Sequence, residues 1–176
     1  MSKYEYVVSD GGPHIFLPKN LSSEWTGVSS SLDISNPNSD FGRAMNASLR
    51  SPLESITVGP GSVVVFEASG MTTWSQSSTG YLYIFDLVHW TSTDLDALVD
   101  RAAEFADESA MATTGIPLEL AEADGYLIYA GDSPRSSAYG FATIPLAAGK
   151  YEVLTITYDG ADGSVRVHCL HPVVAD

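Results

Sequence analysis

Residues 54–68 read ESITVGPGSVVVFEA: a short strand pattern, a Gly-Pro-Gly bend and a longer apolar run. Because that run is apolar at every position, it predicts a strand that is buried on both faces. Residues 141–158 read FATIPLAAGKYEVLTITY and have the same layout. Each stretch is followed by a turn and a final strand pattern, at residues 80–90 and 163–173. The two stretches therefore predict two similar antiparallel meanders.

A helix is predicted between these meanders, over residues 93–108. Thr93 is placed as its N-cap, with Asp96 three residues on in the capping-box position. The apolar residues of this segment recur at helical spacing on one stripe: Leu95, Leu98, Val99, Ala102 and Ala106. The expected fold class is therefore α+β, mostly antiparallel β in two similar halves, with one amphipathic acidic helix between them.

The length of 176 residues fits a single domain over residues 1–176, with pseudo-repeats at 1–90 and 111–176 linked by the helix 93–108. Residues 28–53 are rich in Ser, Asn, Pro and Gly, so we expect a long loop there, with a short helical turn near residues 41–49. In the last strand, Arg166 and His168 share one face, and that face is expected to be in contact with solvent.

Charge is the outlying feature of the composition. Eight Lys and Arg residues stand against 22 Asp and Glu residues, which gives a net charge of −14. Nucleic acids and anionic membranes would repel such a chain, so neither is expected as a partner. A basic protein partner, or solubility alone, would account for the charge.

The negative charge is concentrated between residues 86 and 124, where ten acidic residues accompany the single base Arg101. On the predicted helix, four of the acids form one exposed row, which we call the acidic ridge: Asp96, Asp100, Glu104 and Asp107. Like charges at this spacing destabilise a helix by roughly 0.2–0.5 kcal/mol per pair. Near the C-terminal end, Glu104, Asp107 and Glu108 also oppose the helix dipole. A binding surface for a basic partner would explain this arrangement, and a solvated acidic face is the simpler alternative.

Trp74 lies in a Ser/Thr-rich stretch, residues 71–79, which is interpreted as a loop. Exposed aromatic side chains are enriched at the centres of interfaces, so Trp74 joins the candidate binding residues. Those candidates are Asp96, Asp100, Glu104, Asp107, Glu108 and Trp74.

Cys169 is the single cysteine, so an internal disulfide is excluded and a reducing compartment is favoured. It lies on the apolar face of its strand, which favours a buried and inert thiol. The first ten residues lack the basic and apolar regions of a signal peptide, and no apolar run is long enough to span a membrane. A cytoplasmic protein is expected.

Catalytic and metal-binding motifs are not found in the sequence. There is no phosphate-binding loop and no nucleophile elbow. His168 and His171 are three residues apart on one strand, so they point to opposite faces and cannot share a metal ion there. We therefore expect no catalytic residues, no metal and no cofactor. An enzyme using His14 or His89 with nearby carboxylates would need these groups to meet in a cleft.

The N-terminal stretch SDGGPHIFLPKNLSSEWTG, residues 9–27, resembles the opening of the immunity protein 21 family, which has a Gly-Gly-Pro, an apolar run, a Leu-Pro and a Trp-x-Gly. The stretch ITVGPGSVVVFEASGMTTW, residues 56–74, looks like the second block of that family. From residue 61 onward, the pieces GSVVVFEA, GYLYIFDL and LAAGKYEVLTITY are similar in layout to the bacterial inhibitor of the DNA-entry nuclease, the competence J protein.

These resemblances imply an immunity (antitoxin-like) protein that binds a cognate bacterial toxin in the cytoplasm and inhibits it. The acidic ridge fits a toxin of the nuclease type, because such toxins have basic substrate-binding clefts. The alternative is a module that binds a small ligand in a pocket lined by Tyr81, Tyr83, Phe85 and Trp90.

Overall fold

The computed structural model describes residues 2–29, 31–67, 70–77 and 80–173, and within them the strands form two antiparallel sheets. The six-stranded sheet has the order β1 (Val7–Val8), β5 (Met71–Gln76), β6 (Leu82–Trp90), β11 (Gly163–Pro172), β10 (Gly149–Gly160), β7 (Ala112–Leu120). The five-stranded sheet has the order β3 (Leu53–Val58), β4 (Gly61–Phe66), β2 (His14–Pro18), β8 (Gly125–Tyr129), β9 (Phe141–Ile144). The helices are α1 (Ser31–Ser35), α2 (Asp40–Arg50) and α3 (Leu95–Phe105), with 3-10 turns η1 (Lys19–Leu21) and η2 (Glu108–Ala110).

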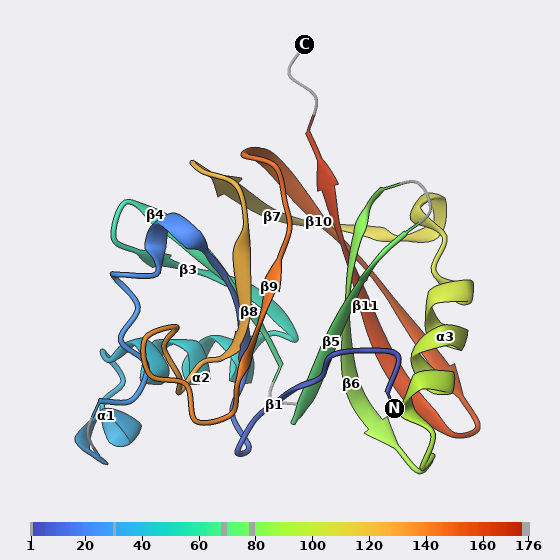
Figure 1. Ribbon diagram of the computed structural model, residues 1–176, viewed down its shortest axis with the longest axis horizontal. Helices are drawn as coiled ribbons and strands as arrows, with labels where there is room; N and C mark the ends of the chain where they lie inside the picture. Colours follow the sequence, from blue (N-terminus) through green and yellow to red (C-terminus); the bar gives the residue numbers. More distant parts are fainter. Residues whose placement is uncertain (1, 30, 68–69, 78–79, 174–176) are drawn as a thin grey trace.

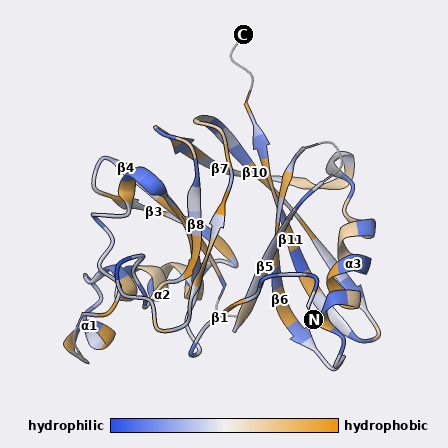
Figure 2. Ribbon diagram, in the orientation of Figure 1, coloured by the Kyte–Doolittle hydropathy of each residue, from blue (hydrophilic) through white to orange (hydrophobic). Residues whose placement is uncertain are grey.

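The elements form four layers, with α2 outside the five-stranded sheet, the two sheets face to face, and α3 outside the six-stranded sheet (Figure 1). Three apolar clusters separate these layers. The central one, between the sheets, includes Phe16, Phe66 and Ile84, which are all fully buried. Figure 2 shows hydrophobic residues along the strands of both sheets, interspersed with hydrophilic ones.

The structure confirms the α+β, mostly antiparallel fold class. The Gly-Pro-Gly bend predicted after residue 58 is the tight turn of the β3–β4 hairpin, and Gly59 adopts a positive φ of 52° there. Cys169 is fully buried, as expected from its apolar face. Within the described residues, no helix is long and apolar enough to cross a bilayer.

Two parts of the chain differ from the prediction: the short helical turn expected near residues 41–49 is a longer helix, and the loop expected around Trp74 is wrong. Within residues 28–53, the chain forms the eleven-residue helix α2, which packs Ala44 and Ala47 against the five-stranded sheet. The Ser/Thr-rich stretch that contains Trp74 is strand β5, paired with β6. Both segments are rich in Ser, Thr or Asn, which suggested loops, although α2 buries Phe41, Ala44 and Ala47 at helical spacing.

The two halves of the chain contribute strands to both sheets. β6 pairs with β11 and β2 pairs with β8, so each sheet joins the halves at its centre. However, residues 54–68 and 141–158 do not occupy equivalent places. β3 and β4 are neighbours in one sheet, whereas β9 and β10 lie in different sheets. The sheet order instead matches β1, β5 and β6 with β7, β10 and β11, and an internal duplication stays a prediction.

Helix α3 is shorter than predicted at both ends, running from Leu95 to Phe105. Its N-cap is Asp94, whose side chain accepts a hydrogen bond of 3.1 Å from the Ala97 backbone N–H. The predicted cap Thr93 is therefore wrong by one residue. Leu98, Val99 and Ala102 on its inner stripe are fully buried against the six-stranded sheet.

Replacing the cap should distinguish the two assignments. We expect Asp94→Ala to lower the free energy of unfolding by about 1 kcal/mol, because one backbone N–H at the helix start loses its partner. Thr93→Ala should leave that energy almost unchanged. Urea unfolding followed by circular dichroism measures both, and an equal loss in the two variants would contradict the Asp94 cap.

Candidate functional site

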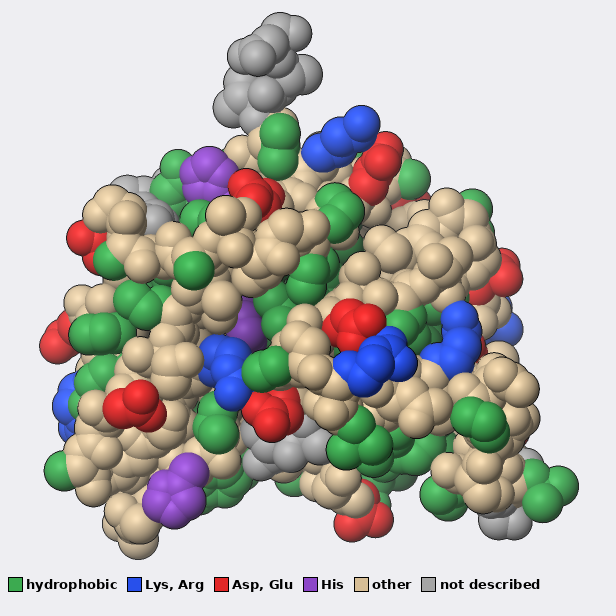
Figure 3. Space-filling view, turned by 180° about the vertical axis from the view of Figure 1, so that it is seen from behind, with side chains coloured by type: hydrophobic (Ala, Val, Ile, Leu, Met, Phe, Trp, Pro, Cys, Tyr) green, Lys and Arg blue, Asp and Glu red, His purple; other side chains and the backbone are tan. Residues whose placement is uncertain are grey.

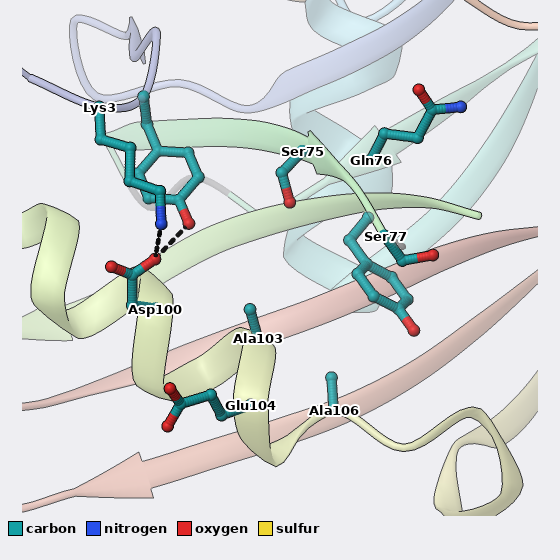
Figure 4. Close-up of a pocket in the computed structure, with 10 residues that line it drawn as sticks. Lys3, Ser75, Gln76, Ser77, Asp100, Ala103, Glu104 and Ala106 are labelled. Atoms are coloured by element: carbon teal, nitrogen blue, oxygen red, sulfur yellow. Dashed lines mark hydrogen bonds and ion pairs between the residues drawn. The ribbon is translucent and has the colours of Figure 1, made fainter. Parts of the chain in front are cut away.

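A groove of about 610 Å³ runs between α3 and the edge of the six-stranded sheet (Figure 4). Asp100, Ala103, Glu104 and Ala106 form the wall on the side of α3. Strand β5, the residue after it and the start of the chain form the other wall, together with Tyr83 of β6: Lys3, Tyr4, Ser75, Gln76, Ser77 and Tyr83. Two residues of the predicted binding surface, Asp100 and Glu104, therefore lie in one groove.

Packing determines which side chains face this groove. Leu98 and Ala102 point into the core beneath α3, so residues on the opposite face of the helix point away from the sheet. Asp96, Asp100 and Glu104 follow one another at intervals of one helical turn. The acidic ridge therefore exists over these three residues, whereas Asp107, predicted as its fourth member, lies beyond the end of α3.

The structure shows that the chain itself partly compensates the charge of the ridge, whereas the sequence analysis found only Arg101 as a base nearby. Lys3 Nζ lies 2.5 Å from a carboxylate oxygen of Asp100, and the Lys3 backbone N–H donates to Asp96 at 2.5 Å. The hydroxyls of Tyr4 and Tyr6 donate to Asp100 and Asp96 at 2.6 and 3.0 Å. The start of the chain, which carried no signal in the sequence, thus supplies the partners of two ridge carboxylates.

These contacts favour the charged form of both carboxylates. Donation from the Lys3 backbone and the Ser2 hydroxyl lowers the pKa of Asp96 below its ordinary value. The Lys3 ammonium and the Tyr4 hydroxyl lower the pKa of Asp100 in the same way. Both groups therefore stay ionised at neutral pH.

The remaining candidates differ in their surroundings. Glu104 is exposed, and within the described part of the chain no hydrogen bond or ion pair to its carboxylate is found. Asp107 follows the end of α3 and accepts hydrogen bonds from the backbone and hydroxyl of Ser109. Glu108 begins η2, and its side chain lies outside the described residues. Trp74 is partly buried against the central core, so its predicted exposure on a loop is wrong.

Most basic side chains are already bound within the molecule. Six of the eight Lys and Arg residues form ion pairs with carboxylates of the chain: Lys3, Lys19, Arg43, Arg50, Arg101 and Arg166. Figure 3 shows several basic side chains beside acidic ones on the back of the molecule. Most basic side chains are therefore paired within the protein, and the protein as a whole keeps a net charge of −14.

A second group of polar residues lies between the two sheets and was missed by the sequence analysis. Asp86 of β6 is fully buried, and Arg166 of β11 lies opposite it, with Nη1 3.3 Å from its carboxylate. Arg166 also pairs with Glu67 at 2.7 Å. On the other side of Asp86, Thr72 Oγ1 lies 3.5 Å from its carboxylate and 2.8 Å from Nδ1 of the buried His14. We call His14, Thr72, Asp86 and Arg166 the polar row.

His168 is the next residue of β11 on the same inner face, and it is fully buried. Within the described residues, neither of its ring nitrogens has a hydrogen-bond partner, and the same is true of Thr155 Oγ1 on the neighbouring strand. Burial lowers the pKa of His14 to about 4 and that of His168 to about 3, where Arg166 adds to the effect. The expectation that Arg166 and His168 face solvent is wrong, because the second sheet covers this face.

The positions of the aromatic and histidine side chains bear on the two alternatives, a small-ligand pocket and an enzyme. The aromatic run proposed to line a ligand pocket is divided: Tyr83 borders the groove, Phe85 is fully buried and Tyr81 stacks on His171 with ring centroids 5.1 Å apart. His14 lies between the sheets, whereas His89 is exposed on β6, so the structure does not bring these two together.

Among the described residues, no group of three His, Cys, Asp or Glu side chains is placed to hold a metal ion. Comparison of the chain with models of protein families, with curated proteins and with solved structures gave no match. The resemblance to the immunity protein 21 family therefore stays a hypothesis carried by the sequence blocks alone.

The buried ion pair gives a stability test. We expect Arg166→Met to lower the free energy of unfolding by about 3–5 kcal/mol, because it leaves the buried Asp86 carboxylate without its counter-charge. The double variant Asp86→Leu/Arg166→Met should recover much of that loss, since no uncompensated buried charge remains and Glu67, the other partner of Arg166, is 41% exposed. Chemical unfolding of both variants measures this, and a double variant no more stable than the single one would refute it.

The buried histidines should make the protein acid-sensitive. Their pKa values in the folded state lie below the ordinary value of 6.5. Between pH 6.5 and about 4, these histidines are therefore protonated in the unfolded chain but stay neutral in the folded protein. Stability is therefore complete above pH 6.5 and falls as the pH drops through this window. Each tenfold difference in proton affinity between the folded and unfolded states corresponds to about 1.4 kcal/mol of the free energy of unfolding.

His168→Phe should keep the stability at pH 7, because it removes two unpaired ring nitrogens from the interior, and it should reduce the loss on acidification. Urea titrations at several pH values measure the slope. An unchanged slope in the variant, or imidazole NMR signals of His168 that titrate near pH 6.5, would contradict this assignment.

Proposed function

We propose that this protein is an immunity (antitoxin-like) protein that binds a cognate bacterial toxin and inhibits it by covering a basic surface with its own acidic one. The observation that carries the proposal is the charge balance. The chain has a net charge of −14, while six of its eight basic side chains are already paired internally. A strongly positive partner surface would be attracted from a distance and held on contact.

The groove along α3 is the best-supported docking site. It combines the exposed Glu104, the ionised Asp100 and the aromatic wall of Tyr83 in one concave surface. Carboxylates with an aromatic neighbour suit Lys or Arg side chains, because the ring can pack against the alkyl stem or the guanidinium. A nuclease-type toxin would present such side chains in the cleft that binds its phosphate-containing substrate.

The negative charge also indicates which molecule the protein would bind and in which compartment. A chain with this charge is repelled by nucleic acid, so inhibition would act on the toxin and not on its substrate. We place the complex in the cytoplasm, where a toxin against nucleic acid would act and where the lone thiol of Cys169 would stay reduced. Binding alone accounts for inhibition in this proposal, without a catalytic group or a cofactor.

The direct experiment uses a candidate toxin domain, such as one encoded by a gene adjacent to that of this protein. Co-purification of the two chains, and loss of the toxin's activity at an equimolar ratio, would support the proposal. A toxin that remains unbound and fully active in the presence of excess protein would reject it.

Charge reversal tests the docking site within that complex. We expect Glu104→Lys to slow association with the toxin by about tenfold at low ionic strength and to weaken its salt dependence. Glu122→Lys, in the turn between β7 and β8, changes the net charge equally and serves as the matched control. Stopped-flow measurements at several salt concentrations compare the association rates of the two variants. Equal effects in both variants would show that the groove is not part of the interface.

A further inference from the structure

The first residues of the chain are bound to α3 much as a separate peptide would be. Residues 2–6 form no helix or strand, and we call them the N-terminal strap. Lys3 lies on the rim of the groove, and its ammonium points at Asp100 (Figure 4). The strap therefore presents a basic side chain to the surface proposed to receive a basic partner.

Asp96 receives donors from three residues of the strap. The Ser2 hydroxyl donates to one carboxylate oxygen at 2.8 Å, and the Lys3 backbone N–H donates to the other at 2.5 Å. The Tyr6 hydroxyl donates to the first oxygen at 3.0 Å. Both oxygens are thus occupied by donors from outside the helix.

Asp100, one helical turn further on, holds the charged part of the strap. A single oxygen of this carboxylate accepts from Lys3 Nζ at 2.5 Å and from the Tyr4 hydroxyl at 2.6 Å. The side chains of Lys3 and Asp100 are 61% and 41% exposed. An ion pair this exposed contributes little to stability and is screened by salt, so another ammonium or guanidinium group can exchange with Lys3.

The rings of Tyr4 and Tyr6 hold the strap more firmly than Lys3 does. Both are packed against the apolar cluster beneath α3, and Tyr4 contacts the ring of Phe85 with centroids 6.4 Å apart. Glu104 lies on the same groove beyond Asp100 and is not engaged by the strap. An incoming segment could therefore contact Glu104 first and then displace Lys3 from Asp100.

We propose that the N-terminal strap is an internal ligand of α3, and that it competes for Asp100 with a Lys- or Arg-bearing segment of the partner protein. This inference rests on the proposed function for the identity of the partner, but the competition itself can be tested without a toxin. If the strap is closed between half and nine-tenths of the time, it weakens the apparent affinity for such a segment by roughly twofold to tenfold.

The test uses the full chain and a hexalysine peptide, with binding followed by NMR at the backbone amides of α3. We expect Lys3→Ala/Tyr4→Phe to bind the peptide roughly twofold to tenfold more tightly at α3 than the parent does. Lys150→Ala removes the same charge from an exposed lysine elsewhere on the molecule, so it controls for net charge. Thermal unfolding confirms that each variant remains folded.

Tighter binding at α3 in the strap variant than in Lys150→Ala supports competition. So does a shift of the signals of residues 2–6 in the parent as the peptide is added. Equal affinities in the two variants, or strap signals that stay in place while the α3 signals shift, would overturn it. The peptide experiment does not test whether the protein inhibits a toxin. Conversely, a failure to bind the toxin would not contradict competition between the strap and a basic peptide.

Discussion

Burial of Leu98, Val99 and Ala102 against the six-stranded sheet determines the direction of every carboxylate on α3. Because this stripe is fully buried, the helix cannot rotate to hide or spread its acidic residues, and Asp96, Asp100 and Glu104 must lie along its outer surface. The same packing brings α3 alongside β5 and the start of the chain, which creates the groove. The core contact thus produces the surface feature on which the functional proposal depends.

A second constraint follows from the face-to-face packing of the two sheets. The polar residues of β6 and β11 that face inward are covered by the second sheet: Asp86 and His168 are fully buried, and the Arg166 side chain is only 15% exposed. Asp86 is stabilised by Arg166 and Thr72, whereas His168 has no partner among the described residues. Desolvation makes such an arrangement an uncertain source of stability, and apolar residues of similar size could replace it. The polar row is better explained by register, because a shift of β6 against β11 would separate the buried charges.

The sequence predicted the architecture to a useful extent because the buried strands are rich in Val, Ile and Phe. The runs at residues 63–66 and 82–87 signal strands by composition alone. It placed only a short helical turn near residues 41–49 where α2 lies, and it missed β5, because both segments are rich in Ser, Thr or Asn. Nor could it assign the inner face of β11, because the polar alternation of Arg166 and His168 has the same appearance on a solvated strand.

For the candidate site, periodicity correctly placed Asp96, Asp100 and Glu104 on one face of a helix. The contribution of the strap could not be predicted, since Lys3 and Asp100 are 97 residues apart and no local pattern connects them. Long-range pairing of this kind depends on the sheet order, which brings β1 and β5 to the edge of the sheet beside α3. Trp74 was misplaced for the related reason that its strand was not recognised.

The strap also changes how the acidic ridge can be understood. A row of like charges on a helix lowers its stability, and donors from residues 2–6 offset part of that repulsion without removing the overall negative charge. A partner that displaced Lys3 would have to supply an equivalent cation, because Asp100 would otherwise lose its counter-charge in a desolvated interface. Neutral or acidic surfaces cannot meet that requirement. The Lys3–Asp100 ion pair would therefore favour basic partners, since only a cationic side chain can replace Lys3 without a net loss of electrostatic energy.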